Sequence, residues 1–418
     1  MKAGTAKIAI TPEGVVDLSG FGAREQPSVG VHDDIFARCV ALEQDGRKLA
    51  ICSLEILGLD FEQVDWLRGE LAQDGYRPEN LLFCGTHTHG GPAVQSLRLC
   101  GTASPAYEKQ LLKAIVKAVR EAGKQMKECR VNVGAAPCAL GVNRRKPGVT
   151  GTQLEPNPGG DTDPELVAAQ IRSFNGEPIA TIFNYACHAV ILGGDNRLVT
   201  GDWPGAAMEK LQSDGFGLTL FLQGCCGDVN PVIRGTWEHR EKAAEMAVAA
   251  VREALEHASD AAEGGAAGAM YPVSLPLLPN PSDEELRARL DEINALAPDQ
   301  RGFAEWRDLI WCADVINAPE KSRRTELPIA TGELRIGDLV IAWLPAEAFS
   351  AYSRAIKAAR TPGKTMVAAY TNGNIGYLPT AAAYSEGGYE VHDAYRYYAY
   401  QMIAPESEDL VLETFGAA

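Results

Sequence analysis

Two histidines that stand two positions apart in a glycine-rich segment are the residues of this chain best suited to chemistry. His87 and His89 follow an apolar run over 81–83 that is typical of a buried strand. Side chains two positions apart on a strand point to the same face, so the spacing predicts that both imidazoles project together from the end of this strand. A neutral imidazole binds metal ions and exchanges protons near pH 7. Because the chain has only seven histidines, their pairing here predicts a metal or catalytic site.

Four further residues at strand ends or in loops are candidates, and each also has an ordinary structural explanation. His188 closes the apolar run 181–188, where a lone histidine is commonly a core residue with satisfied nitrogens. Glu347 follows another apolar strand and can equally be a carboxylate that interacts with a helix dipole. Tyr377 and Tyr389 lie in glycine-containing loops, where tyrosines are usually packing residues. The residues alone leave both explanations open for all four.

The elements that must position these residues alternate between strands and helices, with hairpins interspersed. The stretch 146–164, rich in Pro, Gly, Thr and Asp, is predicted to be a long functional loop, and 258–269 an exposed connection. Alternation of this kind predicts a mixed α/β (α+β) fold with the chemistry at strand ends, in one catalytic domain over 1–418. Turn residues and periodicity predict hairpins over 35–57, over 166–189 and around 337–338, and helices around 60–75, 107–127, 238–257 and 282–320.

Composition restricts the classes of partner. With 39 Lys and Arg against 55 Asp and Glu, the formal charge is −16, which disfavours nucleic acid and anionic membranes but leaves a local basic pocket open. We expect no transmembrane segment, since no apolar run reaches roughly 18 residues, and no secretory signal. The ten cysteines include no Cys-x-x-Cys pair, and several lie in apolar runs. These features predict a reduced, cytoplasmic location and make a structural zinc knuckle unexpected. A homo-oligomer is compatible with the sequence.

Taken together, segments spread over nearly the whole chain resemble the neutral/alkaline ceramidase family, in the same order. Thr86-His87-Thr88-His89-Gly90-Gly91-Pro92 resembles the family motif Thr-His-Thr-His-Ser-Gly-Pro, and the strand ending in His188 resembles its second histidine segment. The other matching parts are the N-terminal segment 10–33, Gly227-Asp228-Val229-Asn230-Pro231 (Gly-Asp-Val-Ser-Pro-Asn in the family), Pro345-Ala346-Glu347 (Pro-Gly-Glu), and Tyr377 and Tyr389, which match two tyrosines twelve residues apart.

The resemblance implies a catalytic domain with a Zn²⁺ site and an amide hydrolase that acts by attack of metal-bound water on a small-molecule or amphiphilic acyl substrate. It places His89 beside the metal as oxyanion donor or proton carrier, and Tyr389 on the substrate or intermediate. It matches Arg144 to an arginine of the pocket, although Arg145 is an alternative at this position. The zinc ligands implied are His87, His188, Glu347 and Tyr377.

Departures from the family pattern bear on the substrate. Asn230 stands where the family has serine; it can donate a hydrogen bond but cannot be a nucleophile. The immunoglobulin-like C-terminal domain of the family is expected to be absent. We therefore expect a substrate other than ceramide, with a zinc-dependent ester or lactone hydrolase, or a non-catalytic ligand-binding paralogue, as alternatives. Asp202 is expected to orient a zinc-bound histidine or to cap a helix, and Cys225-Cys226 to fill a tight turn rather than to bind the metal.

Overall fold

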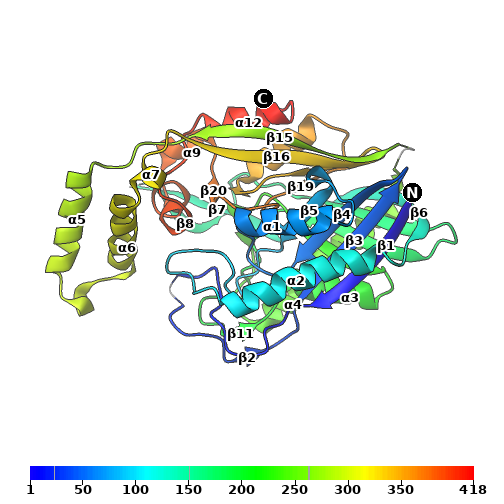
Figure 1. Cartoon of the computed structure of the whole chain (residues 1–418), viewed down its shortest axis with the longest axis horizontal. Coiled ribbons are helices and arrows are strands. Elements are labelled where there is room, and N and C mark those ends of the chain that lie inside the picture. The colour runs from blue at the N-terminus through cyan, green and yellow to red at the C-terminus, as the bar shows by residue number, and fades with distance from the viewer. Residues whose placement is uncertain (23, 150, 262–263) are drawn as a thin grey trace.

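A mixed sheet lies at the centre of the computed structural model, which describes residues 1–22, 24–149, 151–261 and 264–418 (Figure 1). Within these residues the sheet has nine strands in the order β12-β10-β9-β6-β1-β3-β4-β5, with β14 also paired to β6. Neighbouring strands are antiparallel except the pairs β4–β5 and β10–β12. The strands are β1 (Lys2–Ala9), β3 (Phe36–Gln44), β4 (Arg47–Leu54), β5 (Leu81–Gly85), β6 (Lys127–Pro137), β9 (Glu165–Ser173), β10 (Pro178–Tyr185), β12 (Leu218–Gln223) and β14 (Ser259–Asp260).

A second, smaller sheet packs on one face of the central sheet. Side chains of β4 alternate, so that Ile51 faces the second sheet and is buried with Trp343 and Leu334, whereas Cys52 faces the helices on the opposite side. This alternation fixes the register, because a slip by one residue would exchange the two faces. The second sheet has the order β15-β16-β17-β19 and consists of β15 (Ala266–Pro276), β16 (Glu326–Ile336), β17 (Leu339–Trp343) and β19 (Thr365–Ala368).

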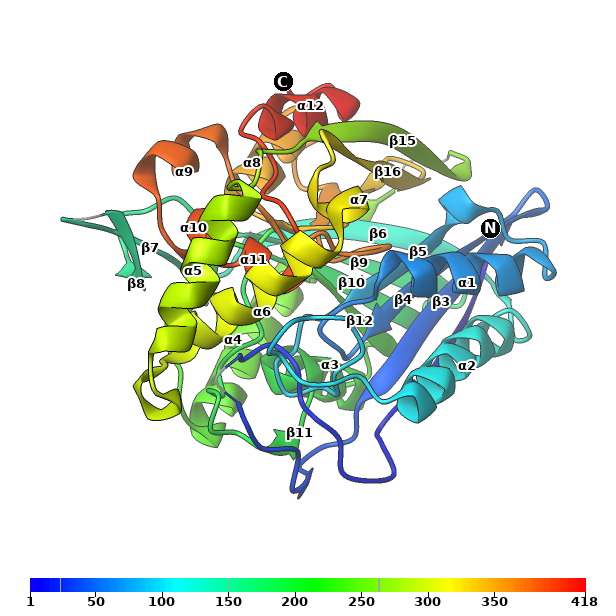
Figure 2. The same cartoon turned by 60° about the vertical axis from the view of Figure 1, so that its left-hand side comes forward.

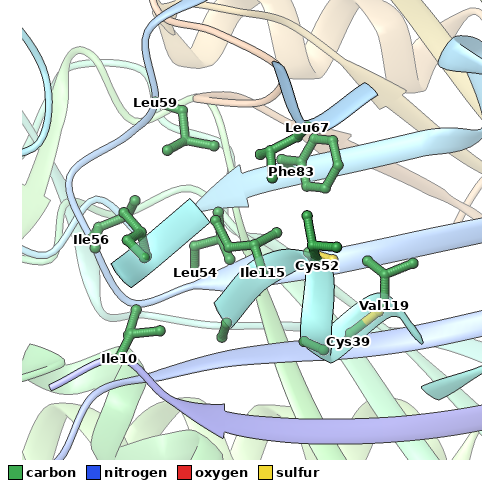
Figure 3. Close-up of a cluster of buried hydrophobic side chains, with 14 of the residues drawn as sticks. Ile10, Cys39, Cys52, Leu54, Ile56, Leu59, Leu67, Phe83, Ile115 and Val119 are labelled. Carbon is green, nitrogen blue, oxygen red and sulfur yellow. The ribbon is translucent and has the colours of Figure 1, made fainter. Parts of the chain in front are cut away.

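Helices cover the outer face of each sheet, which gives four layers in the order helix, sheet, sheet, helix. The helices α1 and α2 bury their apolar sides on the β3–β5 half of the central sheet, where Ile115 and Val119 of α2 lie against Cys39 and Cys52 (Figure 3). The helices α3 and α4 cover β9, β10 and β12, while α8 and α12 cover the second sheet. Their bounds are α1 (Phe61–Ala72), α2 (Pro105–Ala122), α3 (Asp202–Ser213), α4 (Trp237–Glu256), α8 (Ser350–Ala358) and α12 (Ser407–Thr414).

Short elements connect the layers and surround the strand ends. The helices α5 (Asp283–Ala295) and α6 (Phe303–Asn317) form a pair at the edge of the molecule, which comes to the front in Figure 2. Across the described parts of the chain, no helix combines the length and apolar composition of a membrane span. The remaining elements are β2 (Gly30–Val31), β7 (Gly141–Gly148), β8 (Gly151–Asn157), β11 (Leu198–Val199), β13 (Val229–Pro231), β18 (Glu347–Ala348), β20 (Tyr377–Leu378), α7 (Pro319–Ser322), α9 (Ala381–Glu386), α10 (Tyr389–His392), α11 (Tyr395–Tyr398), and the 3-10 turns η1 (Pro78–Asn80) and η2 (Pro298–Gln300).

The predicted mixed α/β class is confirmed, and so are the three hairpins, but two predictions of irregular structure are wrong. The stretch 146–164 is no long loop: most of it belongs to the hairpin β7–β8, whose strands are exposed enough to carry a polar, turn-like composition. Residue 150 lies outside the described residues. Of the expected connection 258–269, the part from Ala266 onward belongs to β15, and residues 262–263 lie outside the described residues. The start of β15 lies close to the backbone of η1, since a Cβ on Gly268 would lie 1.8 Å from the Glu79 carbonyl oxygen. This close approach requires a glycine at position 268.

Candidate metal centre

His87 lies just beyond the end of the edge strand β5, and its backbone turns sharply there. Its φ of 60° is in the left-handed region, so the strand-face explanation of the His87/His89 spacing is wrong. The two imidazoles converge nevertheless, with their Nε2 atoms 3.3 Å apart. His87 Nδ1 lies 3.0 Å from the Leu57 carbonyl oxygen, which only accepts, so Nδ1 carries the proton. His87 Nε2 therefore faces the cluster.

His188 reaches the same point from the end of β10. Its Nδ1 donates to the carbonyl oxygens of Cys226, at 2.6 Å, and Val229, at 3.1 Å. Its Nε2 is buried and has no hydrogen-bond partner among the described residues. Burial, followed by the positive charge of Arg144, lowers the pKa of His188 from 6.5 to about 4. The ring is therefore neutral at pH 7, with a free lone pair, which is the state a metal ligand requires.

Glu347, in the short strand β18 that follows β17 of the second sheet, brings a fully buried carboxylate to these two imidazoles. Its Oε2 lies 3.3 Å from His87 Nε2 and 3.5 Å from His188 Nε2. Burial alone would raise the pKa of Glu347, but the imidazoles of His87 and His188 hold it well below its usual range. The carboxylate is therefore ionised. Gly227 permits this approach, because a Cβ there would lie 2.4 Å from the Glu347 carbonyl oxygen.

The described residues thus include a group that can hold a metal ion. The ligand atoms of His87, His89 and His188 all lie within 4.8 Å of one another, and Glu347 Oε2 contacts two of these rings. In both His87 and His188, a backbone carbonyl fixes Nδ1 and leaves Nε2 facing the carboxylate, as is usual for metal-binding histidines. The donors present therefore fit a bound cation. His89 is as close as the expected ligands, so geometry alone does not separate a ligand from a neighbour of the metal.

Tyr377 and Arg144 extend the cluster on the side of β18. Tyr377 is the register partner of Glu347 in the short parallel pair β18–β20. Arg144 Nη2 donates to the Tyr377 hydroxyl oxygen at 2.8 Å, and Nη1 to Asn230 Oδ1 at 3.4 Å. Arg145 shares Glu390 with Arg144, at 2.6 Å, and otherwise donates to Glu386 and the Gly387 carbonyl oxygen. Of the two candidate arginines, Arg144 is therefore the one that contacts expected site residues.

Tyr389 completes the set, at the start of the short helix α10. Its ring centroid lies 5.8 Å from that of Tyr377, and burial raises its pKa well above the usual 10, so its hydroxyl is protonated at neutral pH. The contacts above form two groups, one around Glu347 and one around Arg144, and the pairing of β18 with β20 links them. The residues come from the segments after β5 and β10, from the strands β7, β13, β18 and β20, and from α10. The eight expected site residues placed in this way are His87, His89, Arg144, His188, Asn230, Glu347, Tyr377 and Tyr389.

A family model described as neutral/alkaline non-lysosomal ceramidase, N-terminal, matches residues 2–266. This is well over half of the chain. The chain belongs to this family.

Individual members of the ceramidase family are distant relatives. Neutral ceramidase B of Dictyostelium discoideum is 28% identical over 250 residues, which cover 53% of this chain and 34% of that protein. Neutral ceramidase of Drosophila melanogaster is 24% identical over 262 residues, which cover 56% of this chain and 36% of that protein. The chain thus matches about a third of the length of these relatives. The crystal structure of neutral ceramidase from Pseudomonas aeruginosa has the same fold, with a TM-score of 0.76 at 18% identity over 99% of this chain and 73% of that chain.

In this member of the ceramidase family, two tyrosines that the sequence did not single out contact Glu347. The Tyr370 ring stacks on His87 with centroids 4.0 Å apart, and its hydroxyl donates to Glu347 Oε2 at 3.4 Å. The Tyr398 hydroxyl donates to Glu347 Oε1. Tyr370 ends the apolar run 366–370, which was an available signal in the sequence. Tyr398 lies in an aromatic segment where nothing in the sequence distinguishes it from its neighbours.

Asp202 supports the loop after His188 and not an imidazole. Its carboxylate accepts from the backbone N–H groups of Ile191 and Leu192, both at 3.2 Å, and of Trp203 at 2.6 Å. It lies at the first position of α3. The N-cap residue is Gly201, so Asp202 does not cap the helix as the second alternative expected; it fixes the backbone just beyond the candidate ligand.

Cys225 and Cys226 are buried free thiols, like the other eight cysteines. Burial raises the pKa of both, so neither is a ready thiolate at neutral pH. Cys226 Sγ lies 3.1 Å from the Tyr370 hydroxyl. This agrees with filling of a tight turn.

Proposed function

We propose that this protein is a zinc-dependent hydrolase that cleaves the amide bond of an N-acyl substrate other than ceramide. The observation that carries the proposal is the convergence of two imidazole Nε2 atoms on one oxygen of the buried Glu347 carboxylate. A buried carboxylate that faces two imidazole nitrogens is stabilised by positive charge at that point, which a bound cation supplies. Membership of the ceramidase family supports the same reaction class.

Zinc is the metal that suits these donors best. His87 and His188 supply two nitrogens, Glu347 supplies one oxygen, and Tyr377 supplies a phenolic oxygen on the neighbouring strand. Borderline nitrogen ligands together with hard oxygens, in a buried site, favour Zn²⁺ over Mg²⁺ or Ca²⁺, which prefer oxygen alone. Burial raises the pKa of the Tyr377 phenol well above 10, and the donation from Arg144 to its oxygen would offset the negative charge of a metal-bound phenolate. Tyr377 is therefore the proposed fourth ligand.

When bound, zinc polarises a carbonyl and makes a water molecule acidic enough to attack it near pH 7. The residues of this chain supply the rest. His89 is neutral at pH 7, because burial and the neighbouring His87 and His188 keep its pKa well below 6.5. It can accept a proton from the attacking water and return it to the leaving amine. Tyr389 is proposed to donate to the developing oxyanion, a contact commonly worth about 3 kcal/mol of barrier.

Arg144 is proposed to orient Tyr377 and the substrate. Its three guanidinium nitrogens bind Glu390, Asn230 and Tyr377, which fixes the guanidinium plane. In the family motif the Asn230 position is a serine, so the group presented beside Arg144 differs here. This difference supports a substrate other than ceramide. The Phe21 ring, with its centroid 4.8 Å from that of His89, offers an apolar surface that suits an acyl compound.

Metal analysis joined to a substrate panel tests the proposal. We expect about one zinc per chain by elemental mass spectrometry, and loss of it in His188→Ala. The wild type is then assayed on N-acyl amino acids and N-acyl amines of graded chain length, on ceramide, and on esters and lactones. Turnover of an N-acyl compound above ceramide supports the proposal. Turnover of esters or lactones alone replaces the amidase by an esterase, and a zinc protein that turns over nothing indicates a ligand-binding paralogue.

A further inference from the structure

The two oxygens of Glu347 have different surroundings. Oε2 is the atom that faces both imidazoles, at 3.3 Å from His87 and 3.5 Å from His188. Oε1 accepts a hydrogen bond from the Tyr398 hydroxyl. The carboxylate is completely buried, so no bulk water competes for Oε1. Oε2, which also accepts a longer hydrogen bond from the Tyr370 hydroxyl at 3.4 Å, is therefore the oxygen that faces the imidazoles.

We propose that Tyr398 is a positioning residue, which holds Glu347 so that only Oε2 is presented to the metal. The inference rests on the proposed zinc site and adds to it a residue outside the ligand set. A free carboxylate can rotate about its last bond and bind a cation through one oxygen or both. A phenol that donates to one oxygen stops this rotation, and O–H···O⁻ bonds are among the stronger hydrogen bonds in proteins. Hydrogen-bonded ligands of this kind tune metal affinity.

The backbone beneath Tyr398 is shaped to hold its ring in this place. Gly376 has a φ of 86°, and a Cβ there would lie 2.9 Å from Tyr398 Cγ. The ring therefore rests on the glycine that directly precedes Tyr377. The Glu347 backbone N–H donates to the Gly376 carbonyl oxygen at 2.8 Å. Glu347, Tyr377 and Tyr398 are thus tied to one backbone position.

The short helix α11, which carries Tyr398, is fixed from outside by charged side chains. Arg396 Nη1 donates to Asp308 of α6 at 2.6 Å. Arg98 Nη1 donates to the carbonyl oxygens of Ala399, at 2.9 Å, and of Arg396, at 3.2 Å. These contacts place the hydroxyl independently of any metal. The hydrogen bond from Tyr398 to Glu347 is therefore supported by the fold around α11.

Tyr398→Phe tests the inference, with Tyr384→Phe as a matched control. The control removes a hydroxyl that donates to the Ile403 carbonyl oxygen at 2.7 Å, away from the metal ligands. Zinc affinity is measured by competition with a chromophoric chelator, and ligand geometry by the visible spectrum of the cobalt-substituted protein. We expect Tyr398→Phe to weaken zinc binding about 10- to 100-fold and to change the cobalt spectrum, and Tyr384→Phe to stay within about twofold of wild type. Melting of the metal-free proteins verifies that both variants fold.

The outcomes separate the inference from the proposal on which it rests. If wild type binds zinc and Tyr398→Phe matches it in affinity and cobalt spectrum, the positioning role is overturned and the proposed zinc site stands. A similar loss in both variants also overturns it, since any buried hydroxyl would then have the same effect. If the wild type binds neither zinc nor cobalt, the proposed function is overturned and the inference with it.

Discussion

His87 Nε2 and Glu347 Oε2 lie 3.3 Å apart, although one follows the edge strand of the central sheet and the other follows a strand of the second sheet. The polypeptide between them builds most of both sheets. A cation held by these two atoms would therefore bridge the two sheets. Metal binding and stability should then be coupled, because the metal binds the folded chain and has no such site in the unfolded one.

Removal of the metal is expected to lower thermal stability. If free zinc exceeds the dissociation constant about 1,000-fold, bound metal stabilises the fold by about 4 kcal/mol. The melting temperature is measured by calorimetry before and after treatment with a chelator and after zinc is restored. His188→Ala is the control, since it is expected to melt at a temperature that the chelator does not change. If the chelator does not change the melting temperature of the wild type either, the result would contradict a metal bound between the sheets.

His89→Gln is expected to keep its metal and lose turnover. His89 is proposed to carry a proton, and loss of such a group typically costs about 10²- to 10⁴-fold in rate. The measurement pairs elemental analysis with kcat on the amide substrate found by the panel. Because His89 Nε2 lies only 3.3 Å from His87 Nε2, loss of the metal in this variant would instead make His89 a ligand and overturn its assignment.

Gly20→Ala is expected to displace the His89 ring, which packs directly against Gly20. A Cβ on Gly20 would lie 2.4 Å from His89 Cγ, and the φ of Gly20 is 95°, a conformation that alanine adopts poorly. Displacement of a catalytic ring by about 1 Å can cost about 10²-fold in rate. We expect kcat/KM to fall by that order while zinc content is unchanged. Gly14→Ala, where the added methyl meets nothing within 4 Å, should behave as wild type; equal kinetics in both variants would rule out this role for Gly20.

The sequence singled out residues that the structure brings together, but not the geometry that does so. The family motifs pointed to His87, His188, Glu347 and Tyr377, and the Nε2 atoms of the two histidines lie within 3.5 Å of Glu347 Oε2. The reason offered for His87 and His89 was nevertheless wrong, since His87 has a φ of 60° beyond the strand. Local periodicity cannot predict a left-handed residue that tertiary contacts impose. Tyr398 was missed because its hydrogen bond joins segments far apart in the chain.

Buried elements were predicted well and exposed ones poorly. The hairpin of β3 and β4 is apolar along both strands because both of its faces are covered. This apolar pattern allowed the hairpin to be predicted from the sequence. The hairpin of β7 and β8 lacks it, because its outer part is exposed and polar. It was predicted as a loop. It nevertheless carries Arg144, so its placement mattered for the site.

Asp228→Asn is expected to change the pH dependence of stability. Burial raises the pKa of Asp228 from its ordinary 3.8 to about 6, even though its carboxylate accepts from the backbone N–H and hydroxyl of Ser350. Between these two pH values the folded chain retains a proton that the unfolded chain has released. Stability therefore falls as the pH rises through this window, by up to about 3 kcal/mol from this one group. The loss is complete above pH 6 and absent below about pH 4.

Asparagine does not titrate, so the variant lacks this dependence while the other acids of the protein contribute equally to both curves. The measurement is urea unfolding of the chelator-treated wild type and Asp228→Asn at pH 4.5, 5.5, 6.5 and 7.5. We expect the wild type to lose stability relative to the variant between pH 4.5 and 6.5, and the difference to be constant above that. The altered hydrogen bond to Ser350 changes the free energy of unfolding of the variant by an amount independent of pH. Only the change with pH of the difference in unfolding free energy between the two proteins is therefore informative. Parallel curves, or a wild type that gains on the variant as the pH rises, would show that this carboxyl is ionised in the fold with an ordinary or lowered pKa.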